Sequence, residues 1–148
     1  MRIYQNPNGF AVVELWKADD GSCERIHAWG DHVADADIHQ HRSDFVSTVL
    51  EGFFNEEIWT HQDDPDGEWE RMTVDCVNDG DEYRVDVLDR TRCTVEIKEV
   101  LVHRQGTTYE RSATDLHRVF PVKLPLVTRV NFGLVTNRVH MMIRKIGK

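Results

Sequence analysis

Three histidines have the residue type and spacing that could do chemistry. His39 and His41 form an H-x-H pair, and His117 lies far downstream. Side chains two apart on a β-strand project from the same face, so the pair can close on one metal ion that a remote histidine completes. Three neutral imidazoles suit divalent iron, zinc, nickel or copper and leave coordination positions open. The pattern therefore favours a metal site at which a substrate or oxygen can bind.

Each of these histidines also has a plainer interpretation. In a chain with eight histidines an H-x-H pair arises by chance, and it then lies at the surface or packs half-buried. His117 lies between Leu116 and Val119, which also fits a hydrogen-bonded core histidine. The metal interpretation is preferred because the motif is embedded in the β-rich context that it requires.

The segments around the histidines alternate between apolar and polar residues or are rich in β-formers, and none predicts a helix of more than a few turns. Three β-hairpins are predicted: residues 10–17 with 23–30, residues 44–52 with 53–60, and residues 69–77 with 83–89. Alternation shifts within residues 93–106, which indicates either a β-bulge or a strand break. The last two strands are expected at residues 126–135 and 139–146. About ten short strands predict an all-β sandwich or barrel.

Length and composition limit the functions that the chain can have. Its 148 residues predict a single domain over residues 1–148, and the net charge of −8 argues against a nucleic-acid partner. Three cysteines without C-x-x-C spacing, in a chain without a recognisable signal peptide, predict no disulfide framework and a cytoplasmic location. No apolar run approaches the roughly 20 residues of a membrane span, so no membrane partner is expected.

Other polar residues near the histidines have weaker predicted roles. A ligating imidazole is oriented through its other ring nitrogen, and three residues lie near enough in sequence to do this or, equally, to cap a turn: Asp44, Ser47 and Asp115. We expect His27, His103 and His140 to be packing or rim residues and His61 to be solvated. The cluster of His32 with Asp31, Asp35 and Asp37 is either a cation site or, more commonly, an acidic surface loop.

Two segments resemble the conserved motifs of the cupin superfamily. The segment "IHQHRSDFVSTVLEGFFNEEIW" is similar to the first motif, in which an H-x-H pair ends a strand and a glycine turn, here Gly52, follows a second strand. The segment "GTTYERSATDLHRVF" is similar to the second motif, which supplies the remaining histidine. The resemblance implies a double-stranded β-helix, the cupin jelly-roll barrel, with a metal inside its mouth.

The ligand set narrows the resemblance to one branch. Most cupins add a glutamate ligand after a gap of three or four residues beyond H-x-H, where this chain has Phe45 and Val46, with Asp44 just before them. The three-histidine set and "DLHRV" resemble the cysteine dioxygenase branch instead. That resemblance implies Fe(2+) as cofactor, with zinc or nickel as alternatives. It also implies a small-molecule thiol substrate that reacts with oxygen to give a sulfinic acid.

The chain departs from that branch on the strand after the third ligand. The thiol dioxygenases have Ser, His and Tyr at alternate positions there, and this chain has Thr128, Val130 and Phe132. Such a wall is mostly apolar and favours a substrate bulkier or less charged than cysteine. Six side chains are expected to contact the substrate: Thr48, Tyr109, Arg111, Thr128, Val130 and Phe132. Arg111 could pair with a substrate carboxylate or bridge a neighbouring carboxylate.

Two functions of different classes follow. The first is a mononuclear metal oxidoreductase of the thiol dioxygenase-like type, although isomerase or hydrolase chemistry on the same metal is an alternative. The second is a non-enzymatic cupin that binds a small ligand or a protein, with a structural metal or none. The resemblance also suggests a homodimer formed through an edge strand at residues 1–10.

Overall fold

The computed structural model describes residues 1–6, 9–31, 37–79 and 82–147. His32 and Asp35 of the acidic cluster lie outside the described residues. The described residues form an all-β structure, as predicted, and none of them forms a helix long and apolar enough to cross a membrane. The strands are β1 (Arg2–Gln5), β2 (Ala11–Lys17), β3 (Cys23–Trp29), β4 (Ile38–His39), β5 (Phe45–Asp63), β6 (Trp69–Asp79), β7 (Glu82–His103), β8 (Thr108–Arg111), β9 (Leu116–Phe132) and β10 (Val139–Lys145).

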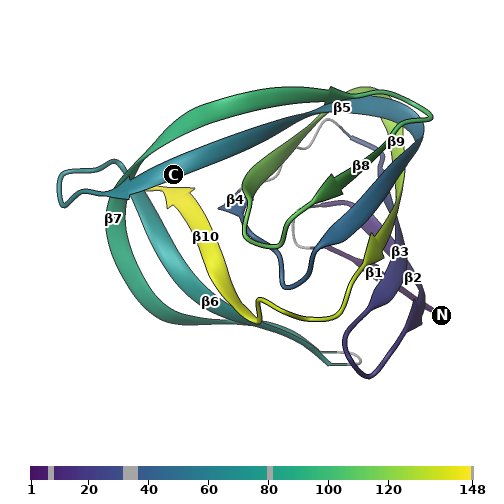
Figure 1. The fold of residues 1–148 in the computed structure, drawn as a ribbon, viewed down its shortest axis with the longest axis horizontal. Coiled ribbons are helices and arrows are strands. Elements are labelled where there is room, and N and C mark those ends of the chain that lie inside the picture. Colours follow the sequence, from purple (N-terminus) through teal and green to yellow (C-terminus); the bar gives the residue numbers. More distant parts are fainter. Residues whose placement is uncertain (7–8, 32–36, 80–81, 148) are drawn as a thin grey trace.

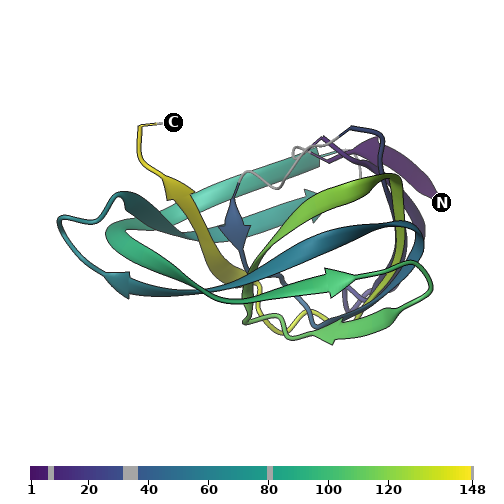
Figure 2. The same ribbon diagram turned by 90° about the horizontal axis from the view of Figure 1, so that it is seen from above.

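All strands belong to one antiparallel sheet with the order β1-β2-β3-β9-β4-β10-β6-β7-β5-β8, and β9 also pairs with β5. The extra pairing closes a circuit that runs β9–β4–β10–β6–β7–β5–β9. The long strands β5, β7 and β9 bend across the molecule, as Figure 1 shows, with β6 and β10 toward one end and β1 to β3 at the other. The view in Figure 2 shows the same separation of β10 from the N-terminal strands. The arrangement is consistent with a β-sandwich.

Two predicted hairpins are present and one is wrong. β2 pairs with β3, and β6 pairs with β7, as expected. The hairpin around Gly52 is replaced by the single strand β5, which runs through this glycine. Gly52 has φ of 76°, and a Cβ there would lie 2.3 Å from the Lys123 carbonyl oxygen. Gly52 therefore allows β5 to approach β9 closely and does not reverse the chain. The register between the two strands shifts at this point.

The irregularity within residues 93–106 is a bulge and not a strand break. β7 continues to His103, while its register with β5 shifts between Ile58 and Trp59. These two residues pair with Glu99 and Ile97, which leaves Lys98 without an opposite residue. The bulge lets one strand satisfy two patterns of alternation.

Hydrophobic packing fixes the relative position of β4 and β9. Ile38 and Leu116 belong to one buried cluster, in which Cys93 and Ile143 also pack. Because successive side chains on a strand point to opposite faces, burying Ile38 and Leu116 on one face turns the residues that follow them to the other. A second cluster, which includes Val49, Phe54 and Leu126, fills the other part of the molecule.

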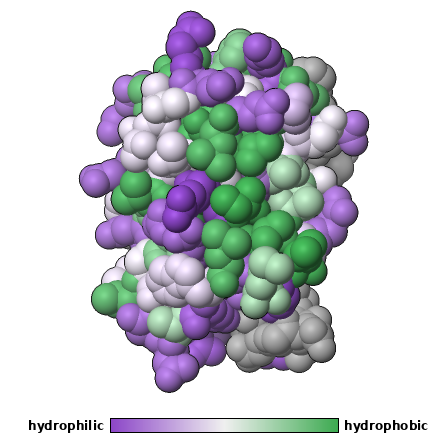
Figure 3. Space-filling view, turned by 90° about the vertical axis from the view of Figure 1, so that its right-hand side faces the viewer, coloured by the Kyte–Doolittle hydropathy of each residue, from purple (hydrophilic) through white to green (hydrophobic). Residues whose placement is uncertain are grey.

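The first strand pairs within its own chain. β1 lies at the edge of the sheet and pairs with β2. These two strands expose Ile3, Leu15 and Trp16. Figure 3 views the molecule from this end and shows apolar side chains gathered in the middle of the face. The predicted homodimer remains a prediction.

Candidate metal centre

His39, His41 and His117 come together, as the sequence predicts. His39 lies directly opposite His117 in the β4–β9 pairing, so both rings project from one face. His41 follows β4, where its backbone N–H donates to the Ala113 carbonyl (3.1 Å) and its carbonyl accepts from the Asn137 side chain (3.0 Å). The three ring centroids lie 4.8 to 4.9 Å apart, and one potential ligand atom from each ring lies within 4.8 Å of the others.

The distance between two of the ring nitrogens fits shared ligation. The Nε2 atoms of His41 and His117 are 2.8 Å apart. Imidazole nitrogens bound at about 2.0–2.1 Å to one divalent ion lie roughly 2.8–3.4 Å apart, from octahedral to tetrahedral angles. The observed distance is therefore at the short end of the range for two nitrogens that share one ion. Among the described residues no carboxylate joins the group, in agreement with the predicted all-histidine set.

In His39 and His117, the hydrogen-bond partner of Nδ1 determines which ring nitrogen can bind a metal. The Nδ1 atom of His117 is 2.6 Å from the carboxylate of Glu56, and the Nδ1 atom of His39 is 3.0 Å from the carbonyl oxygen of Asp37. Carboxylate and carbonyl oxygens only accept, so both Nδ1 atoms carry hydrogen, and in the neutral form of each ring the lone pair then lies on Nε2. A neutral imidazole ligand needs this tautomer. Two of the three rings are thus held ready to ligate.

Glu56 is the centre of a buried charged network behind His117. Its side chain is fully buried, and its oxygens accept from His117, from His103 Nε2 (2.9 Å) and from Arg111 Nε (3.0 Å), with a second Arg111 nitrogen in contact. Burial raises the pKa of Glu56, but the hydrogen bonds from His103, His117 and Arg111 outweigh burial and hold this pKa well below its usual range. The ring of His103 stacks on Tyr109 at 3.8 Å between centroids. Glu56 is therefore ionised and fixes the orientation of His117.

The predicted orienting residues have other partners. Asp44 accepts from the backbone N–H of Ala113 (2.7 Å), which ties down the loop before β9, and Asp115 pairs with Arg111. Ser47 is buried and lines the cavity described below. Glu56 was missed, although a signal for it exists. It alternates with Phe54 and Ile58, so the strand pattern places its charge on the inward face.

Three imidazoles at or near the site, those of His27, His41 and His140, have lowered pKa values. Burial lowers the pKa of His41 well below its usual range, and the neighbouring rings of His117 and His39 lower it further. Burial, with the nearby charge of Arg25, lowers the pKa of His27 to about 3. The pKa of His140 is lowered mainly by burial. Neutral imidazole is the form that binds metal.

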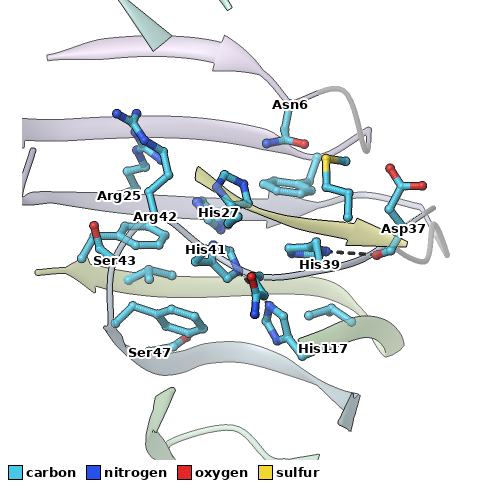
Figure 4. A pocket seen from close by; sticks show the side chains of 18 of the residues that line it. Asn6, Arg25, His27, Asp37, His39, His41, Arg42, Ser43, Ser47 and His117 are labelled. Atoms are coloured by element: carbon cyan, nitrogen blue, oxygen red, sulfur yellow. Dashed lines mark hydrogen bonds between the residues drawn. The ribbon is translucent and has the colours of Figure 1, made fainter. Parts of the chain in front are cut away.

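The three histidines lie in the wall of a cavity of about 560 Å³. Figure 4 shows His39, His41 and His117 close together, with Arg25, His27 and Arg42 farther along the same cavity. Of the residues predicted to contact substrate, four line this cavity: Tyr109, Thr128, Val130 and Phe132. The alternation on β9 is as predicted, because Arg129 and Asn131 are exposed.

The other two predicted contacts lie elsewhere. Thr48 pairs through its hydroxyl with Thr108 on β8 (2.9 Å), and Arg111 is held by Glu56 and Asp115. The sequence left two partners open for Arg111, a substrate carboxylate or a neighbouring carboxylate. The structure shows an ion pair with the neighbouring Asp115 and a second one with Glu56, which was not expected. His27 and His140 line the cavity, although the sequence suggests only packing or rim positions.

No protein-family model and no curated protein sequence matches this chain. The case for the site therefore rests on its geometry, and the resemblance to the cupin superfamily stays a proposal.

Proposed function

We propose that His39, His41 and His117 hold one divalent metal ion, and that the loaded protein is a dioxygenase-like oxidoreductase that uses Fe(2+) and acts on a small molecule, with thiols as the first class to test. The observation that supports this most strongly is the pair of fixed Nδ1 hydrogens, on His39 and His117, which leave lone pairs where three rings converge. The closed circuit of strand pairings around inward-facing histidines supports a cupin jelly-roll barrel as the fold family.

The residues around the centre have separable tasks. Iron, when bound, would supply the redox chemistry and positions for substrate and oxygen. Glu56 keeps the proton on His117 Nδ1, so that Nε2 stays a donor of electrons to the metal. The rings of Phe45 and Phe132, centred 5.0 and 5.9 Å from that of His41, exclude water on that side. The buried hydroxyl of Thr128 adds a polar group to the β9 wall.

Metal analysis of protein purified without an affinity tag tests the centre. We expect one metal ion per chain in the wild type and in His61→Ala, because His61 lies on β5 outside the cavity. His117→Ala should lose the ion while keeping the circular dichroism spectrum of a β protein. Competition between Fe(2+), Zn(2+) and Ni(2+) then identifies the preferred ion.

Oxygen uptake by the iron-loaded protein tests the reaction. We expect consumption of oxygen with at least one member of a panel of thiols, and none with His117→Ala. Full iron loading without turnover on any thiol would remove the thiol dioxygenase proposal and leave the metal centre standing. Stably folded protein that binds none of the three metals would refute the centre and favour the non-enzymatic alternative.

A further inference from the structure

Aromatic rings in the cavity lining follow one another in a series of contacts that starts at His41. The ring of Phe132 is centred 5.9 Å from that of His41 and 6.3 Å from that of His27. His27 in turn contacts Phe10 (4.9 Å), which packs on Trp29 at 4.5 Å. All five side chains line the cavity. Such a wall suits a planar apolar group, because offset and edge-to-face ring contacts favour aromatic partners.

One arginine in the cavity lining has no carboxylate partner among the described residues. Three cavity arginines are neutralised by acidic side chains, in the pairs Arg25–Glu14 (2.9 Å), Arg90–Glu70 (2.7 Å) and Arg144–Asp37 (2.8 Å). Arg42 differs from them, because no described residue forms an ion pair or side-chain hydrogen bond with it and its Nε–H is buried without an acceptor. Figure 4 shows Arg42 on the same segment as His39 and His41, with its guanidinium directed away from the three rings.

A charged guanidinium that lines a cavity and has no carboxylate partner among the described residues can bind an anion that enters the cavity. Guanidinium donates in a planar fork that matches a carboxylate, and a charge-assisted bond of this kind is among the stronger hydrogen bonds. The cavity volume of about 560 Å³ lies in the range of pockets that enclose drug-sized ligands, so free cysteine would fill only a small part of it.

We propose that the cavity binds an aromatic carboxylic acid, with its carboxylate on Arg42 and its ring against the wall formed by Phe132, His27 and Phe10. The carboxylate and the ring are separate determinants, because the guanidinium recognises charge and the aromatic wall recognises a ring. That this acid is the substrate, or contains the reacting group, rests on the function proposed above. Binding of the acid itself does not require the metal.

Isothermal titration calorimetry on metal-free protein tests the carboxylate contact, with 3-phenylpropanoate and 3-phenylpropanamide as probes. We expect the acid to bind the wild type about 10- to 100-fold more tightly than the amide, the range of one charge-assisted hydrogen-bonded contact. In Arg42→Gln the two probes should bind within about 3-fold of each other, and Arg42→Lys should be intermediate. Arg138→Gln is the matched control, because Arg138 is exposed and pairs with Asp75 outside the cavity.

A third probe, 3-cyclohexylpropanoate, tests the aromatic wall. It should bind about 3- to 10-fold more weakly than 3-phenylpropanoate, the range expected for an aromatic pair contact. Equal binding would overturn the aromatic part of the proposal. Equal binding of the acid and the amide, no binding of either, or an unchanged preference in Arg42→Gln would overturn the carboxylate contact.

Repeating the titrations on zinc-loaded protein separates this inference from the proposed function. A preference for the acid that appears only with zinc, and that Arg42→Gln leaves intact, would assign the carboxylate to the metal and refute the role of Arg42. Protein that binds no metal but keeps an Arg42-dependent preference would refute the proposed function and support the anion contact. The two ideas can therefore fail independently.

Discussion

Replacing Glu56 with glutamine should weaken both the fold and the metal centre. The two carboxylate oxygens accept from His117, His103 and Arg111, and all of these partners arrive as donors. Glutamine keeps the shape but offers only one acceptor oxygen, and its NH₂ group would face a donor. Glu56→Gln also removes the countercharge of Arg111, whose side chain is only 14% exposed.

The expected loss of stability in Glu56→Gln follows from the burial of this network. Removing one partner of a buried, hydrogen-bonded ion pair costs about 3–5 kcal/mol, because the remaining charge stays buried and unpaired. That is a large part of the roughly 5–15 kcal/mol that stabilises an ordinary domain. Loss of the acceptor for His117 Nδ1 should weaken metal binding by about 10- to 100-fold, as for other residues that orient ligating histidines.

Glu57→Gln provides the control for both measurements. Glu57 is the next residue on β5, its side chain is 16% exposed, and it pairs with Arg118 at 2.9 Å. Breaking this pair should cost less than the change at Glu56, because Glu57 and Arg118 both keep some contact with water and Glu56 has none. Urea unfolding gives the two stabilities in metal-free protein, and competition with a chromogenic chelator gives the zinc affinities.

The pH dependence gives an independent check. The pKa of Glu56 in the folded protein lies below its ordinary value of 4.5, so its stabilisation is present above pH 4.5 and is lost as the pH falls below that value. The difference in stability between wild type and Glu56→Gln should therefore shrink in acid. The reasoning is refuted if Glu56→Gln is no less stable than Glu57→Gln and binds zinc equally well.

Three further predictions concern the backbone, the cavity and the metal. Gly52→Ala should cost at least about 2 kcal/mol in urea unfolding, and Gly106→Ala only about 1, because both have positive φ but a Cβ at Gly106 meets nothing within 4 Å. The pKa of His27 is lowered to about 3, so the stability of metal-free protein should fall between pH 6.5 and 3 by at most about 1.4 kcal/mol per unit; an unchanged slope in His27→Phe would contradict this. Free zinc at 100 times its Kd should stabilise the fold by about 2.7 kcal/mol; chelation should reverse the gain, and His117→Ala should lack it.

Much of the fold could be predicted from local patterns. The β2–β3 and β6–β7 hairpins follow from turn residues between alternating segments, and these signals are local. Gly52 shows where such signals fail. A glycine ends many strands, but here it permits β5 to touch the backbone of β9, a contact between residues about 70 apart that no local pattern records. The closed circuit of pairings could not be predicted for the same reason.

The ligands of the candidate site were easier to predict than their supports. The H-x-H spacing and the placement of His117 follow from strand geometry, because burying Ile38 and Leu116 on one face turns the next residues to the other. The partners of the rings come from distant segments. Sequence neighbours such as Asp44 were the natural candidates, but Asp44 fastens a loop while Glu56 reaches His117 across the β5–β9 pairing.

Polar residues on the inward face of a strand therefore predict the partners of a buried ligand better than its neighbours in sequence do. On β5 the inward series continues from Phe54 through Glu56 to Ile58, and a carboxylate there must find donors or be protonated. On β7 the series ends at His103, which supplies one donor. In the cavity Arg42 presents the opposite case, because its guanidinium has no acceptor among the described residues. The charge of Glu56 is compensated within the fold, and its hydrogen bond fixes the candidate ligand His117. The charge of Arg42 has no such partner among the described residues, so an anionic ligand in the cavity can compensate it.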